Sequence, residues 1–476
     1  RLYRSGAAAE RCTGGGRSYR CLQVKPRRKL PVVKEGFVMI RKLMLPFLLL
    51  CLLSGVSVAG AAPALEVSKV QGVVDGYFQE YLADLETLVN TDSKTGDSDG
   101  SARIAEFLKE KLSALGGTVE YRENDKGTYV ISRFKGNGKL RILMLAHTDT
   151  VFDKGEAAKR PFRFDEQTKF AYGPGAGDDK AIVAQTITMM KTLNDLGFRD
   201  YGEIILYYSA EEETGSAFNT NLIAELSRLA DVCLVLDTAK PDWGVVTQRK
   251  GMAKYDLKVT GLAGHAGTPY RGVNAVAELV HQLNEIYKLA SPQPEDPKNL
   301  TAAALKARGI VDHGQFIPAN TINVGMIGTT NKVLNKVPDN AFAKLEVRFY
   351  KMAEGERLDR EIKALAEKPA VAGAKVTVEG GTEVGPMEKT AQVEKIIGLY
   401  RDLVKRNYSA DIIEWSAGGL TDGNYSSLYV PTMDSVGVTG HNVHTDREYA
   451  DLATLGPRTA ALIGLLQELT AQWPLK

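Results

Sequence analysis

The sequence predicts an α/β domain with a mostly parallel central sheet, interrupted by an inserted α+β domain. Continuous apolar runs of strand length alternate with helical patterns up to about residue 250, which is typical of parallel strands covered on both faces. The pattern changes over 251–383, and the alternation resumes after Gly385-Pro386. The length of 476 residues allows two or three domains. We therefore expect residues 62–250 and 384–476 to form one domain around an insert.

Helical and strand patterns follow one another in the main domain. Apolar residues recur at helical spacing from Ile104 to Leu115, and Gly116-Gly117 ends that helix. The turn Gly136-Asn137-Gly138 predicts that the strands on either side of it form a hairpin. The expected elements are helix 70–88, helix 101–115, strand 128–134, strand 140–145, helix 181–196, strand 203–208, helix 221–229 and strand 232–236, and after the insert helix 392–406, strand 430–435 and helix 451–472.

The insert predicts a compact α+β unit of its own. Its strands are grouped around two helical stretches instead of alternating with them. The expected elements are strand 253–259, helix 273–289, strand 320–327, strand 341–349, helix 355–366 and strand 375–379.

Residues 1–61 carry the pattern of an export signal. Basic residues precede an apolar stretch from Leu43 to Leu53 and small residues around Ala61. The stretch is shorter than the roughly 18 residues of a membrane span. We expect 1–38 to lie upstream of the true start and 39–61 to be a signal peptide, which would send the protein to the periplasm or out of the cell. A membrane anchor is the alternative, and we do not expect a stable one.

The net charge of +2 averages two different parts of the chain. Residues 1–61 contain 12 basic and 2 acidic residues, a charge of +10, so the mature chain carries −8. This balance argues against a nucleic-acid partner. Cleavage also leaves Cys233 as the single cysteine, so the mature chain can form no internal disulfide.

Polar clusters follow the predicted apolar strands. His147 and Asp149 follow one strand, an acidic run follows the next, and Asp237 closes the one after that. Asp178 and Asp179 end a glycine-rich turn before a helix. Open α/β sheets bind ligands at the carboxyl ends of their strands. We therefore expect these side chains to lie close together.

Each cluster alone has an ordinary structural explanation. A histidine at a strand end is commonly structural, an acidic pair before a helix can be a cap, and an acidic run is usually solvated. A histidine near an aspartate also suits a metal ligand oriented by a carboxylate. In an extended run, neighbouring carboxylates point in opposite directions, so one can bind metal while the next faces water.

Taken together the clusters predict a two-metal site. A late segment adds His441 and His444, three residues apart. Two histidines and three carboxylates are enough for two metal ions with one shared carboxylate.

Five motifs occur in a fixed order along the chain. They are His147-x-Asp149, Gly175-Ala176-Gly177-Asp178-Asp179-Lys180, Glu212-Glu213-x-Gly215-Ser216, Asp237 and His444-x-x-x-Glu448. The set resembles the co-catalytic zinc peptidases of the glutamate carboxypeptidase family, whose relatives include aminoacylases and succinyl-diaminopimelate desuccinylase. The resemblance covers residues 70–476. It implies a zinc-peptidase-like catalytic domain interrupted by a ferredoxin-like lid and dimerisation domain.

The resemblance also implies a role for each motif residue. Asp178 would bridge two Zn²⁺ ions, for which Co²⁺ or Mn²⁺ are the expected substitutes, and the family's cis peptide bond would fall at Asp178-Asp179. Glu212 would be the general base and Asp149 would orient His147. The remaining implied ligands are His147 and Asp237 for one ion, and Glu213 and His444 for the other.

Two positions leave a choice of register. Glu211 extends the acidic run, and we choose Glu212 and Glu213 because Gly215-Ser216 follows at the family distance. We prefer His444 to His441 because Thr445 and Glu448 fit the motif.

The insert carries further resemblances. Gly264-His265-Ala266-Gly267 resembles the family's lid histidine, which reaches the active site of the partner subunit, and this implies a homodimer formed through the lid domain. Asn323, Arg348 and Gly419 fall where relatives contact the substrate carboxylate. A solvated strand arginine is the alternative for Arg348.

We therefore expect an exported dizinc metallopeptidase that hydrolyses an amide bond. The family resemblance implies release of a C-terminal amino acid, with glutamate as the expected residue, from a small peptide or N-acyl amino acid. An N-acyl amino acid or dipeptide hydrolase is the alternative within the enzyme class. An exported binding protein with a relict metal site is the alternative outside it, although a binder has little use for Glu212.

Overall fold

The computed structural model describes residues 65–290 and 320–473. The expected upstream segment and signal peptide lie outside these residues. No helix in the described ranges is long and apolar enough to cross a membrane.

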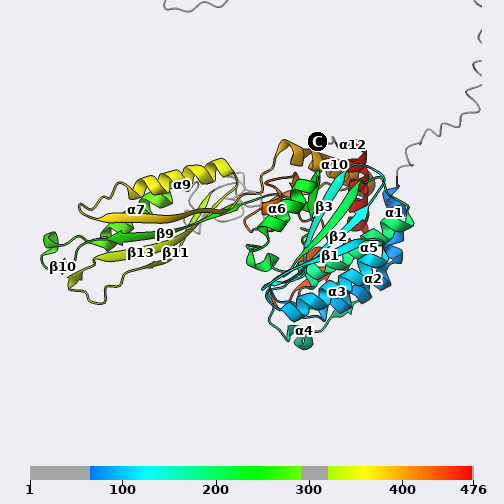
Figure 1. The fold of residues 1–476 in the computed structure, drawn as a ribbon, viewed down its shortest axis with the longest axis horizontal. Coiled ribbons are helices and arrows are strands. Elements are labelled where there is room, and N and C mark those ends of the chain that lie inside the picture. The colour runs from blue at the N-terminus through cyan, green and yellow to red at the C-terminus, as the bar shows by residue number, and fades with distance from the viewer. Residues whose placement is uncertain (1–64, 291–319, 474–476) are drawn as a thin grey trace, which may run out of the picture. The chain divides into compact units, whose positions relative to one another are not determined.

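A six-stranded sheet forms the centre of the main domain (Figure 1), in the order β1-β2-β6-β3-β7-β16. The pairings from β6 to β16 are parallel, and those of β1 with β2 and of β2 with β6 are antiparallel. The predicted α/β fold is confirmed, as a mixed sheet with its antiparallel part at one edge. The strands are β1 (Thr118–Asn124), β2 (Gly127–Lys135), β3 (Arg141–His147), β6 (Glu203–Ser209), β7 (Val232–Val235) and β16 (Thr432–Met433).

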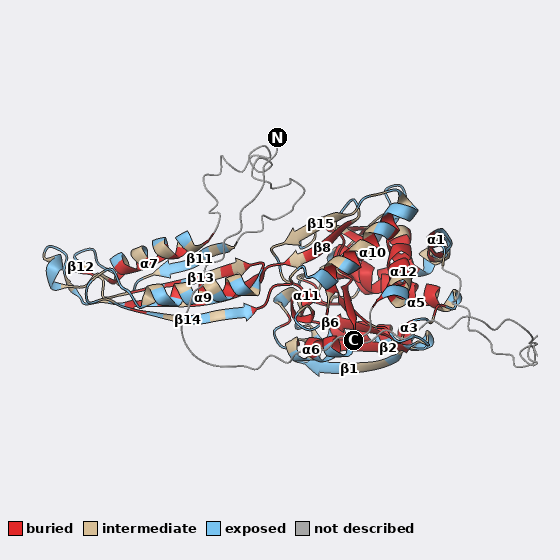
Figure 2. Cartoon of the chain, turned by 90° about the horizontal axis from the view of Figure 1, so that it is seen from above, coloured by how far each residue is buried: buried red, intermediate tan, exposed pale blue. Residues whose placement is uncertain are grey.

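Helices cover both faces of this sheet, since successive strand residues point to opposite sides. On β3, Ile142 and Met144 pack in one apolar core and Leu143 and Leu145 in the other. Figure 2 shows the central strands and α12 almost wholly buried, whereas edge strand β1 is largely exposed. The first core contains α1 (Val67–Gly76), α2 (Phe78–Val89), α3 (Ser98–Ala114), α5 (Ala181–Asp195), α10 (Ala391–Tyr408) and α12 (Leu455–Gln472), and the second contains α6 (Thr220–Leu229) and α11 (Asp422–Ser426).

Two small sheets complete the main domain. One has the order β17-β18-β5-β4, and its hairpin of β17 and β18 carries the segment with His444. The other pairs β8 with β15 in parallel. Their bounds, with that of short helix α4, are α4 (Glu156–Lys159), β4 (Arg163–Asp165), β5 (Phe170–Tyr172), β8 (Gly244–Arg249), β15 (Ile413–Ala417), β17 (Thr439–His441) and β18 (Tyr449–Asp451).

The inserted unit is an antiparallel sheet with two helices on one face (Figure 1). The strand order is β11-β13-β9-β14, and apolar residues of β9 and β13 pack against both helices. A two-stranded pair, β10 with β12, extends the unit. The elements are β9 (Gly251–Thr260), β10 (Gly264–His265), α7 (Ala275–Leu289), β11 (Thr321–Gly328), β12 (Lys336–Val337), β13 (Asn340–Phe349), α9 (Met352–Ala366) and β14 (Lys375–Val384).

The predicted hairpin of β2 and β3 is wrong. Both strands exist, but β6 lies between them in the sheet. The turn glycines serve close backbone packing instead: a Cβ on Gly136 or Gly138 would lie 2.0 or 1.7 Å from a carbonyl oxygen of the segment that enters β6. Hydrogen bonds from Gly136 N to Gly202 O and from Gly138 N to Tyr201 O hold this contact.

Candidate functional site

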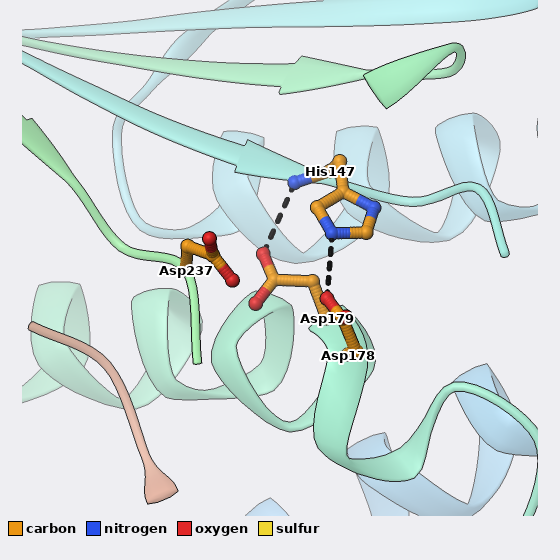
Figure 3. Close-up of side chains that lie close together, drawn as sticks. All are labelled: His147, Asp178, Asp179 and Asp237. Atoms are coloured by element: carbon orange, nitrogen blue, oxygen red, sulfur yellow. Dashed lines mark hydrogen bonds and ion pairs between the residues drawn. The ribbon is translucent and has the colours of Figure 1, made fainter. Parts of the chain in front are cut away.

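The predicted ligands gather where three parallel strands end. His147 is the last residue of β3, Asp237 follows β7, and Glu212 and Glu213 follow β6. Asp178 and Asp179 lie in the short segment Ala176–Lys180 that leads into α5, and the backbone is non-helical at both aspartates. Figure 3 shows His147, Asp178, Asp179 and Asp237 converging from these separate elements.

Asp178 belongs to two groups of ligand atoms. His147, Asp178, Asp179 and Asp237 each offer an atom within 4.8 Å of the others, and so do Asp178, Glu213 and His444. His147 Nε2 lies 2.9 Å from Asp178 Oδ1, and His444 Nε2 lies 3.3 Å from Asp178 Oδ2. The two oxygens of one carboxylate therefore face two different histidines. The peptide bond Asp178-Asp179 is cis, which confirms that prediction.

The acidic run separates into two orientations. Glu212 and Glu213 line a cavity, whereas Glu211 is buried and accepts a hydrogen bond from Phe218 N at 2.9 Å. Glu213 Oε2 lies 3.0 Å from His444 Nε2. The chosen register thus places the two selected carboxylates, and not Glu211, beside the predicted ligands.

His441 and His444 also lie in different surroundings. His444 contacts Asp178 and Glu213. The ring of His441 stacks on Tyr449, with 4.8 Å between centroids. Of the two histidines, His444 is the one that the structure places among the predicted ligands.

Asp149 connects the first histidine to the acidic run. His147 Nδ1 lies 3.1 Å from the Asp149 carbonyl oxygen and 3.4 Å from Oδ1. The Asp149 carboxylate also accepts hydrogen bonds from Glu212 N at 3.1 Å and from Glu213 N at 3.2 Å. One buried side chain therefore holds both His147 and the backbone that carries Glu212 and Glu213.

Glu448 is a buried residue to which the sequence assigned no role. Its Oε1 accepts hydrogen bonds from Gly177 N at 2.8 Å and from Asp178 N at 3.0 Å. Because Glu448 and His444 share one loop, this contact ties the loop of one predicted ligand to the backbone of another. The motif spacing pointed to Glu448, but only the fold shows what it contacts.

A cavity of about 380 Å³ is lined by four of the predicted metal ligands, Asp178, Glu213, Asp237 and His444. Its lining includes the carboxylates Asp178, Glu212 and Glu213 and the cations Lys240, Arg249 and Arg348. The cavity therefore combines an acidic cluster suited to metal ions with basic groups suited to an anionic substrate.

The predicted substrate residues divide into two sets. Arg348 and Gly419 line the cavity, and the buried Nη1 of Arg348 has no hydrogen-bond partner in the described part of the chain. His265 lies exposed on β10, and Asn323 lies exposed on β11 beside a separate hollow. The structure does not bring His265 or Asn323 into the cavity of their own chain.

Sequence reasoning missed Arg249 and Asp434. Both are buried, and the guanidinium of Arg249 contacts the carboxylates of Asp434 and Asp237. Asp434 is 185 residues from Arg249 in sequence, and an arginine at the end of a strand has no motif of its own. Only the packing of β8 beside the β16 loop brings them together.

Opposite charges at the site shift the pKa values in opposite directions. Burial lowers the pKa of His147, but its bonds to Asp149 and Asp178 outweigh burial and hold that pKa well above its ordinary value. Hydrogen bonds to Asp178 and Glu213 raise the pKa of His444 to about 10. Burial raises the pKa of Asp178, but the two histidines reverse this and hold it below its ordinary value.

The donor set suits divalent metal ions. Imidazole nitrogens and carboxylate oxygens are the ligands that Zn²⁺, Co²⁺ and Mn²⁺ accept. Buried Glu213 Oε1 and Asp179 Oδ1 have no hydrogen-bond partner in the described ranges. Buried oxygens normally have partners, so these atoms fit the coordination or support of a cation.

We expect the metal-free protein to lose stability as the pH rises from about 4 to 8. Burial, the largest cause in each case, raises the pKa of Asp237 to about 6, of Asp422 to about 7 and of Glu448 to about 8. The folded state then binds more protons than the unfolded state, so the free energy of unfolding falls with pH. The raised pKa of His444 changes the free energy of unfolding in the same direction, because the stability that its protonated ring contributes is lost as the pH rises toward about 10. Thermal unfolding in chelator at pH 5 to 9 measures this.

Added Zn²⁺ should remove most of that pH dependence, because a cation stabilises the ionised carboxylates. Glu448→Gln should reduce the loss of stability at the higher pH values in the metal-free protein. Stability that rises between pH 5 and 8 in chelator would contradict the expectation.

Comparison with known proteins identifies the family. Residues 143–468 match the sequence profile of Peptidase family M20/M25/M40. Carboxypeptidase G2 from Pseudomonas sp. (strain RS-16) is 31% identical over 401 residues, covering 81% of this chain and 88% of the relative. A succinyl-diaminopimelate desuccinylase from Gluconacetobacter diazotrophicus is 24% identical over 393 residues, covering 80% of this chain and 95% of the relative.

A solved structure shares the fold. Aminopeptidase PepT from Bacillus cereus superposes with a TM-score of 0.64 at 19% identity, over 83% of this chain and 99% of the other. The profile spans more than half of the chain and includes every predicted ligand. The chain therefore belongs to peptidase family M20/M25/M40 and is a metal-dependent hydrolase.

Proposed function

We propose that this protein is a two-metal carboxypeptidase that hydrolyses an amide bond and releases an acidic C-terminal amino acid, with glutamate as the preferred residue. The observation that carries the proposal is one cavity whose lining includes both Asp178, which two ligand groups share, and the cations Lys240 and Arg348. The similarity to carboxypeptidase G2 supports the carboxypeptidase assignment.

Five residues would hold the metal ions. His147 and Asp237 would bind one Zn²⁺, Glu213 and His444 the other, and Asp178 both, as their grouping around Asp178 supports. Bound metal supplies Lewis-acid chemistry, which polarises the amide carbonyl and makes water more acidic. Asp149 would fix the orientation of His147 through its contacts with the ring Nδ1.

Glu212 would move the proton. It lines the cavity and belongs to neither ligand group, so its carboxylate is free to face a substrate water. Burial, reinforced by Asp237, Asp422 and Glu213, raises its pKa well above the ordinary value. A carboxylate with a raised pKa takes a proton from the attacking water more readily. The same carboxyl then returns that proton to the departing amine nitrogen.

Arg348 would bind a substrate carboxylate. Its Nε bonds to Glu346 at 2.7 Å, while its buried Nη1 has no partner among the described residues. Because Arg348 lines the cavity, its guanidinium can donate hydrogen bonds to a carboxylate bound there. Lys240, which also lines the cavity, supplies further positive charge for a second carboxylate, and this supports an acidic leaving residue.

A hydrolysis panel tests the proposed function. We expect two metal ions per chain, loss of activity in chelator, and the highest kcat/KM for peptides with C-terminal glutamate. Arg348→Met should raise KM about tenfold or more for these substrates, as loss of one charged hydrogen bond implies. Lys389→Met, in a surface ion network with Glu394 and Glu414, is the matched control and should leave KM unchanged.

The panel also decides between the proposed function and its alternatives. Preferred cleavage of N-acyl amino acids would favour a deacylase, a reading that the similarity to a desuccinylase supports. Failure on every substrate despite bound metal would favour a binding protein with a relict site.

We also propose that the protein is exported and forms a homodimer. The basic and apolar pattern of residues 1–61 supports a signal peptide. A homodimer through the inserted unit is supported by exposed His265, which stays outside its own cavity, and by β11, an edge strand with exposed Met326 and Ile327. N-terminal sequencing of exported protein and sedimentation of the purified chain test the two proposals.

A further inference from the structure

Arg249 contacts Asp237, a predicted metal ligand, and both residues line the cavity. Its Nη2 lies 3.1 Å from Asp237 Oδ2, and its side chain is only 6% exposed. The other carboxylate oxygen of Asp237 accepts a hydrogen bond from Thr238 N at 2.5 Å. Each oxygen of Asp237 therefore has a donor that restricts rotation of the carboxylate.

Asp434 holds the arginine in place. It is completely buried, pairs with Arg249 Nε, and accepts from Nη2 at 3.2 Å. Thr421 Oγ1 donates to the same carboxylate at 3.0 Å, and Arg249 Nη1 donates to the Gly419 carbonyl at 3.4 Å. The guanidinium cannot turn away from Asp237 without breaking a buried, charge-assisted contact.

The backbone of Arg249 adds a second constraint. Arg249 ends β8, just before the chain enters the inserted unit. Its N–H and C=O pair with Met387, on the segment that returns from that unit, at 3.0 and 3.1 Å. The residue is thus fixed by its backbone as well as by its side chain.

We propose that Arg249, anchored by Asp434, is a positioning residue that orients Asp237 toward the metal ion it would share with His147. The inference rests on the proposed function, because it requires Asp237 to be a ligand. Arginine suits this position because its planar fork reaches two carboxylates at once, which a lysine ammonium does less well. Removing Arg249 should therefore weaken the binding of one of the two ions and leave the binding of the other unchanged.

Zinc titration of metal-stripped protein tests the inference. Arg249→Met should lower the affinity of one ion about 10–100-fold, the usual effect of losing a group that orients a ligand, and leave the other ion unchanged. Asp434→Asn should weaken the same ion. In an Asp237→Ala background, Arg249→Met should cause no further loss, because the ligand it orients is already absent.

Two further variants control for folding. Arg249→Lys keeps a buried cation for Asp434 and should restore thermal stability without restoring the affinity. The double variant Arg249→Met/Asp434→Asn leaves no unpaired buried charge and should show the same affinity loss. Arg458→Met, which removes an equally buried arginine that donates to the Lys240 carbonyl, should leave both affinities unchanged.

Specific outcomes would overturn the inference. An equal loss of affinity for both ions in the folded variants would mean that Arg249 has only a structural role. Unchanged zinc affinity with a raised KM would mean that it contacts substrate instead. Wild-type protein that binds no zinc would overturn the proposed function itself, and the two failures are thereby distinguished.

Discussion

Replacing Glu212 by glutamine should lower kcat by about 10²–10⁴-fold while both metal ions stay bound. Glutamine keeps the size of the side chain but cannot accept the proton of the attacking water. The backbone should stay in place, because Glu212 N donates to Asp149 Oδ1 and this bond does not involve the replaced group. Steady-state kinetics with metal analysis of the same preparation measure both effects.

Glu211→Gln is the matched control. Glu211 precedes Glu212 in the same acidic run, but its Oε1 accepts from Phe218 N and it does not line the cavity. Glutamine can accept the same hydrogen bond through its amide oxygen, so activity should remain close to wild type. Full activity of Glu212→Gln, or equal losses in both variants, would contradict the assignment of the general base.

Replacing Asp178 by alanine should remove both metal ions and all measurable hydrolysis. The two oxygens of this carboxylate face His147 and His444, so its loss takes one ligand from each group. A ligand present at 100 times its dissociation constant stabilises a folded protein by about 2.7 kcal/mol. The rise in Tm that zinc produces in the wild type should therefore disappear in this variant.

Single-group variants provide the comparison for Asp178. Asp237→Ala and Glu213→Ala each remove a residue from one group only, and each should retain one ion near wild-type affinity. Metal analysis and zinc-dependent Tm shifts distinguish one retained ion from none. An Asp178→Ala protein that still binds two ions would show that the two groups do not share this carboxylate.

The local sequence pattern predicted most elements of the fold, but it did not predict which strands are neighbours in the sheet. Apolar runs located β3, β6 and β7, because a strand buried on both faces must be apolar throughout. The same pattern could not show that β6 enters between β2 and β3. That choice depends on Gly136 and Gly138 contacting the segment before β6, a packing effect between residues distant in sequence.

The local sequence pattern also failed to predict edge strands and the bounds of short elements. The exposed strand β1 alternates weakly in polarity, and the sequence did not predict it. The expected helix 70–88 is two helices, α1 and α2, that meet at Tyr77. Two-residue β16 replaces the longer strand expected at 430–435. Each of these depends more on neighbouring elements than on the periodicity of its own residues.

The sequence by itself determined which chemistry this protein can carry, because ordered motifs at strand ends specify histidines, carboxylates and their spacing. It also determined that these groups meet, since parallel strands bring their carboxyl ends to one edge of a sheet. Only the tertiary structure decided which residues surround them. Arg249, Asp434 and Glu448 contact the predicted ligands through buried ion pairs and backbone hydrogen bonds that join distant segments. Such contacts depend on packing in three dimensions and leave no periodic signal in the chain.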